Sequence, residues 1–68
     1  SVKGGAIEVK TMLDKEFSIL VYDAAGKEVI KQVFQGSTRI STEALQSGVY
    51  FYSVRGAGHL ENGQFIIE

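Results

Sequence analysis

Three acidic residues, Asp14, Glu16 and Asp23, come nearest to a chemical site in this sequence, because clustered carboxylates can bind a calcium ion. The segment Asp14-Lys15-Glu16 has neither the length nor the ligand spacing of a calcium loop, and we expect it to be a charged turn. The one histidine, His59, lies beside a glycine-rich segment and cannot form a metal site by itself. The sequence therefore predicts no metal and no cofactor.

Hydroxyl groups offer no catalytic arrangement either. Ser41 and Thr42 have no base at a spacing that would activate a nucleophile, and we interpret them as caps of a short helical turn. Tyr50 and Tyr52 alternate with Phe51, so one set should pack in the core, where a buried tyrosine needs a partner for its hydroxyl. As an alternative, an exposed pair of tyrosines would bind a sugar. The pattern predicts a protein that is not an enzyme.

Composition further limits the functions and partners that the chain can have. Its 68 residues make one domain, and a domain of this size buries only about 60% of the surface of its unfolded chain. There is no cysteine, and the net charge is −1, with the seven basic residues dispersed along the chain. The longest apolar run, Ile19–Tyr22, is far too short to span a membrane. We expect no nucleic-acid partner and no membrane insertion.

Apolar and polar residues alternate along the chain with a period of two, which is typical of β-strands. Turns separate the strands every eight to twelve residues, and no crossover helix fits between them, so we expect antiparallel pairing in a sandwich or small barrel. One helical turn is predicted over residues 41–45, with Leu45 as its buried anchor. The expected strands cover about residues 6–10, 17–22, 27–34, 39–40, 49–54 and 63–67.

Two glycines are expected where the backbone conformation favours a residue without a side chain. Asp23-Ala24-Ala25-Gly26 predicts a hairpin loop, in which the Asp23 carboxylate accepts hydrogen bonds from turn amides and Gly26 has positive φ. Gly48, just before the aromatic strand, should also meet a backbone requirement. Gly56-Ala57-Gly58 predicts a flexible hairpin tip.

Three segments, taken in order, resemble the C-terminal sorting domain of the type IX (Por-type) secretion system, type A-like. They are a strand–YDxxGKxV–strand hairpin at residues 19–29, LxxGVYF at 45–51 and a short apolar strand at 64–68. The chain departs from the family in having no proline and in carrying Gln64 where a lysine is usual. The residues that carry the resemblance are Tyr22, Asp23, Gly26, Lys27, Val29, Leu45, Gly48, Val49, Tyr50, Gln64, Phe65, Ile66, Ile67 and Glu68.

The resemblance implies an all-β fold, a small antiparallel Ig-like β-sandwich of about six or seven short strands. It implies that residues 1–68 are a single C-terminal sorting domain cut from a larger exported protein, with the cargo domain upstream. The implied partners are the outer-membrane secretion translocon and a sortase-like peptidase that removes the domain. The implied location is the periplasm in transit, and then the outer-membrane surface or the extracellular space.

The terminal residues Phe65–Ile67 allow two compatible interpretations. They form the last core strand, or they present a sheet edge to a receptor by strand addition. An apolar edge strand also allows self-association. Two rival functions remain: a generic Ig-like or fibronectin-like module that binds a partner or carbohydrate, and an accessory domain of an enzyme.

Overall fold

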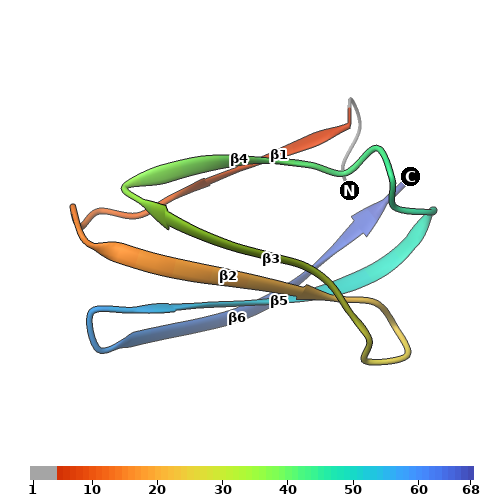
Figure 1. The fold of residues 1–68 in the computed structure, drawn as a ribbon. Helices are drawn as coiled ribbons and strands as arrows, with labels where there is room; N and C mark the ends of the chain where they lie inside the picture. Colours follow the sequence, from red (N-terminus) through yellow and green to blue (C-terminus); the bar gives the residue numbers. More distant parts are fainter. Residues whose placement is uncertain (1–4) are drawn as a thin grey trace.

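The protein is all-β in the computed structural model, which describes residues 5–68 (Figure 1). The expected first strand is confirmed with its predicted bounds, and residues 5–68 contain no helix. The third strand keeps its predicted length of eight residues and is shifted by one residue, and the other four strands are longer than the sequence predicts. The strands are β1 (Ala6–Lys10), β2 (Glu16–Tyr22), β3 (Glu28–Gln35), β4 (Ser37–Ser41), β5 (Gly48–Gly56) and β6 (His59–Ile67).

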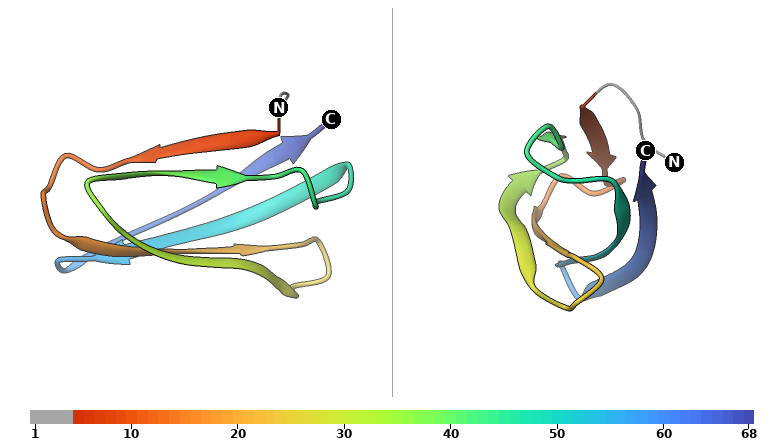
Figure 2. Two further views of the ribbon diagram at one scale, coloured as in Figure 1. Left: turned by 45° about the horizontal axis from the view of Figure 1, so that its top comes forward. Right: turned by 90° about the vertical axis from the view of Figure 1, so that its right-hand side faces the viewer.

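Two antiparallel sheets pack against each other (Figures 1 and 2). Strands β1 and β4 form one sheet, and the other has the order β3-β2-β5-β6. The chain changes sheet between β1 and β2, between β3 and β4, and between β4 and β5, as in a Greek-key sandwich. The expected antiparallel sandwich is confirmed, with six strands in the described part.

The core lies between the sheets and follows the alternation of each strand. In β2, Phe17, Ile19 and Val21 face inward and are buried, as predicted. In β5 the inward set is Tyr50, Tyr52 and Val54, which leaves Phe51 on the outside. Among residues 5–68 the buried hydrophobic residues are Phe17, Ile19, Val21, Phe34, Ile40, Tyr50, Val54 and Ile67.

The predicted helical turn over residues 41–45 is only partly right, because one hydrogen-bonded turn forms there but no helix does. Ser41 ends β4, and a single hydrogen bond, from the Leu45 amide to the Thr42 carbonyl at 3.0 Å, closes one turn. The Ser41 hydroxyl accepts a weak bond from the Glu43 amide at 3.4 Å, so the capping contact forms without a helix behind it. Leu45 packs partly against the core as expected, but β5 begins at Gly48 and leaves too few residues for a second turn.

The last hairpin is tighter and longer than predicted. Ala57 and Gly58 alone connect β5 to β6, and both have positive φ (51° and 79°), as a two-residue type I′ turn requires. His59 is the first residue of β6, and its side chain is exposed. Leu60 is also part of β6, where it points outward and is 59% exposed.

Candidate functional site

The Asp23 hairpin between β2 and β3 has the predicted turn chemistry. The Asp23 carboxylate accepts hydrogen bonds from the Ala25 and Lys27 amides, both at 2.9 Å. The Gly26 amide donates to the Asp23 carbonyl at 3.0 Å, and Gly26 has φ +87°, where a Cβ would be strained. The pairing also shifts between Val21 and Tyr22, which leaves Val29 as the extra residue of a bulge.

The second motif places a buried tyrosine at the start of β5. Tyr50 is 7% exposed, and its hydroxyl donates to the Gln46 carbonyl at 2.7 Å. A tyrosine hydroxyl bonded to backbone just upstream of its strand is also a feature of Ig domains. Gly48 has φ +152°, so the expected backbone requirement is confirmed. Because Tyr50 is buried, Tyr50 and Tyr52 do not form an exposed pair for sugar binding.

The terminal strand divides its side chains between the two faces of the sheet. Ile67 is buried, and Phe65 packs on the core with its ring 5.8 Å from that of Tyr50. Gln64 and Ile66 face outward, and Ile66 is 48% exposed. Glu68 follows β6 and is exposed. The strand is therefore core on one side and surface on the other.

β6 is also an edge strand. In the described part of the chain it pairs with β5 alone, over all nine of its residues. The inner side of its first half is polar, with His59 opposite Gly56 and Glu61 opposite Val54. An inward charge is one way in which natural edge strands avoid unwanted pairing. The second half, residues 63–67, carries no charge and has no such protection.

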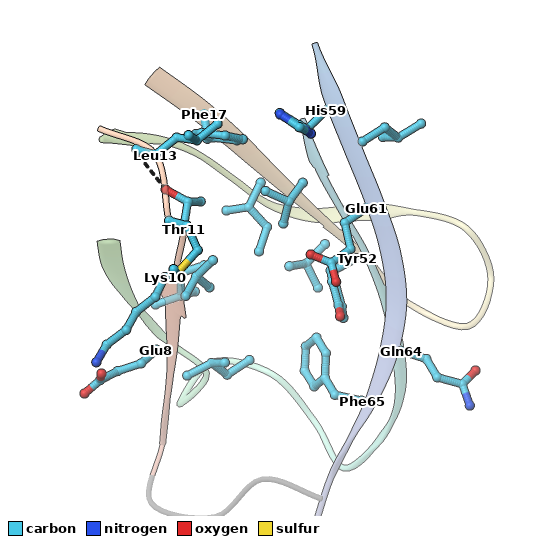
Figure 3. A pocket seen from close by; sticks show the side chains of 18 residues that line it. Glu8, Lys10, Thr11, Leu13, Phe17, Tyr52, His59, Glu61, Gln64 and Phe65 are labelled. Atoms are coloured by element: carbon cyan, nitrogen blue, oxygen red, sulfur yellow. Dashed lines mark hydrogen bonds between the residues drawn. The ribbon is translucent and has the colours of Figure 1, made fainter. Parts of the chain in front are cut away.

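A cavity of about 800 Å³ opens between β1 and this edge of β6 (Figure 3). The right-hand view of Figure 2 shows the two strands side by side near the chain ends, and β1 pairs only with β4 among the described strands. Figure 3 shows Tyr52 and Glu61 turned into the cavity and Gln64 turned away from it. The floor of the cavity reaches the core, so the sandwich is open along this side.

Residues 5–68 contain neither a metal-binding cluster nor a membrane-spanning helix. These residues hold no group of three or more histidine or acidic side chains placed to bind a metal ion. They also form no helix long and apolar enough to cross a membrane. Asp14 accepts a hydrogen bond from the Gln35 side chain at 2.9 Å, and Asp23 serves its own turn.

A comparison with protein families gives one match, to the model of the secretion system C-terminal sorting domain, over residues 4–68. The chain belongs to this family. The family is the C-terminal sorting signal of type IX secretion, and it is not a known enzyme family. A domain of this kind is recognised by the secretion machinery, and its cargo is secreted toward the cell surface or the extracellular space. No curated protein and no solved structure matches the chain.

The motif residues of this sorting domain separate by the direction in which they point. One set builds the fold, through the Asp23 turn, Gly48, Tyr50, Phe65 and Ile67. The other set faces outward from the four-stranded sheet and has no role in the core. This outward set comprises Tyr22, Val49, Gln64 and Ile66.

The structural roles of three residues near the motifs were not predicted from the sequence. Phe51 is 43% exposed and stands directly opposite Tyr22 on β2. A Cβ on Gly63 would overlap the side chain of Tyr52, and a Cβ on Gly56 would lie 2.5 Å from the Glu16 carbonyl oxygen. The aromatic run at residues 50–52 gave the only available signal for Phe51, but that run does not say which residues face inward.

Proposed function

We propose that this domain directs a cargo protein fused upstream of it from the periplasm through the outer-membrane translocon of the type IX machinery. A sortase-like peptidase then removes the domain, and the cargo is left at the outer-membrane surface or outside the cell. The address lies in the terminal strand, which pairs with a receptor strand by strand addition. Residues 1–68 act in this process as one domain of a larger exported protein.

The observation that carries this proposal is the edge of β6 that pairs with no strand in residues 5–68. Backbone groups along an unpaired edge need a partner, and a receptor strand supplies both donors and acceptors. The uncharged half at residues 63–67 suits such pairing better than the half that contains Glu61. The neighbouring cavity between β1 and β6 offers space for alternate side chains of an added strand.

The test is a passenger protein with an ordinary export signal in front and this domain behind, expressed in a host with type IX machinery. The wild-type fusion should reach the medium or the cell surface. Deleting residues 64–68 should leave the passenger in the periplasm, but this deletion also removes the buried Ile67 and the packed Phe65. Loss of Phe65 or Ile67 costs about 2–5 kcal/mol, enough to unfold a domain this small.

A cleaner variant keeps the core and changes the end. Several Gly and Ser residues added after Glu68 should leave the melting temperature unchanged and yet block export, if a free terminal strand is read. Normal export of this extended variant contradicts an address at the terminus.

A further inference from the structure

The outer face of the four-stranded sheet carries an apolar patch that the fold does not require. We define the outer-face patch as Tyr22, Val49, Phe51 and Ile66. Val49, Phe51 and Ile66 are 39%, 43% and 48% exposed. The register places Tyr22 opposite Phe51 and Val49 opposite Ile66, and Val49 and Phe51 are next neighbours on one face of β5.

The opposite surface of the sandwich differs in composition. On β1, the outward residues at the middle and end of the strand are Glu8 and Lys10, and on β4 they are Ser37, Arg39 and Ser41. This is the polar exterior expected of a sheet with one face on the core and one in water. The four-stranded sheet breaks that rule at the outer-face patch. A contiguous exposed apolar patch of this kind marks an interaction site.

Charges around the outer-face patch indicate the chemistry of the partner. Lys31, opposite Leu20, and Arg55, opposite Ser18, occupy outward positions inside the strands of this face. Its outward carboxylates are Glu16, at the first residue of β2, and Glu28, which stands directly opposite Tyr22 of the patch. A partner that places apolar side chains on the patch, carboxylates beside Lys31 and Arg55, and no carboxylate beside Glu28 is complementary to this face.

We propose that the outer-face patch is a second docking surface, bound by an apolar, acid-rimmed protein surface of the secretion machinery. The inference rests on the proposed sorting function and adds a site that is separate from the free edge of β6. A protein suits the patch better than a lipid surface does. Anionic membranes are bound by clusters of about four to eight basic residues, and this face carries two cations on its strands.

The test uses variants on β5, so that the backbone edge of β6 is untouched. Val49→Thr/Phe51→Thr removes the apolar surface, and threonine keeps the strand preference because it is β-branched. The matched control, Val33→Thr, changes a residue of the same face that is 57% exposed, lies on β3 and is outside the patch. The passenger fusion should lose about tenfold or more of its export with the first pair, the size of a lost binding hot spot, and none with the control.

A second variant tests the charges. Its result does not depend on whether the Val49→Thr/Phe51→Thr variant loses strand stability. Lys31→Glu/Arg55→Glu should melt like wild type and also lower export, because it opposes carboxylates on the partner. Export at the wild-type level by both patch and charge variants overturns this proposal and leaves the terminal address standing, whereas a wild-type fusion that stays in the periplasm refutes both.

A lipid partner has a distinct outcome. The isolated domain is mixed with vesicles of phosphatidylethanolamine and phosphatidylglycerol and sedimented. The proposal expects wild type and the Val49→Thr/Phe51→Thr variant to stay in the supernatant alike. Co-sedimentation of wild type that this variant abolishes would assign the patch to a membrane and overturn the protein partner.

Discussion

Gly56 lies where the hairpin of β5 and β6 passes closest to β2, and its replacement by alanine tests that close approach. A Cβ at this position would lie 2.5 Å from the Glu16 carbonyl oxygen and 2.9 Å from the Phe17 Cα. A carbon and a carbonyl oxygen normally stay about 3.3 Å apart, so the two strands must separate locally by about 0.8 Å. Backbone atoms cannot rotate away as a side chain can, and Phe17 is part of the core.

The expected loss can be worked out from two opposing effects. Overpacking costs about 1–3 kcal/mol, and the lower flexibility of alanine in the unfolded chain returns about 0.4–1 kcal/mol. We expect Gly56→Ala to lower the free energy of unfolding by about 1–2 kcal/mol, from a total of about 3–10 kcal/mol for a domain of this size. The melting temperature should fall by about 5–15 °C.

Urea denaturation followed by circular dichroism measures the change. Gly58→Asn is the matched control, because Gly58 has φ +79° with open space around it, and asparagine tolerates positive φ. The control should stay within about 0.5 kcal/mol of wild type. If Gly56→Ala unfolds at the same urea concentration as wild type or a higher one, the close approach of β5 to β2 is not as described.

Three further substitutions test the motif residues that build the fold. Gly26→Val should lower the free energy of unfolding by more than about 1 kcal/mol because of the left-handed backbone at this position. Asp23→Ala should lower it by about 0.5–1.5 kcal/mol through the loss of two turn hydrogen bonds. Equal denaturation midpoints for wild type and Gly26→Val would refute the turn. Tyr50→Phe should cost about 0.5–1.5 kcal/mol by removing the bond to the Gln46 carbonyl, with circular dichroism unchanged, and a midpoint equal to that of wild type argues against this bond.

The sequence predicted well where one local rule decides the structure. The Asp23 loop follows from an acidic residue and a glycine at fixed spacing, and the inward set of β2 follows from simple alternation. Ser41 to Leu45 misled the argument because a capping residue followed by good helix formers looks the same whether or not a helix has room to form. Only the tertiary position of Gly48, at the start of the next strand, decides that question.

The candidate docking surfaces could not be predicted, because they depend on which way a strand faces and on what pairs beside it. In β5, Val49 through Tyr52 are all apolar or aromatic, so alternation gives no sign of the inward set. The free edge of β6 is a property of sheet order, and the sequence holds no record of that order. The length of β6 was missed because residues 59–62 follow the predicted tip at Gly56-Ala57-Gly58 and contain only one apolar residue.

Folding and the proposed recognition depend on the same register in this domain. A slip of one residue in β5 would turn Phe51 into the core and expose Tyr50 and Val54, because successive side chains of a strand point to opposite faces. The outer-face patch and the uncharged half of β6 are therefore present together only when β5 and β6 pair as they do here. A receptor that reads both surfaces binds the folded domain and not an unfolded tail. Export assays on any variant of Tyr50, Phe65 or Ile67 consequently need a parallel melting curve, since loss of the core removes the address as well.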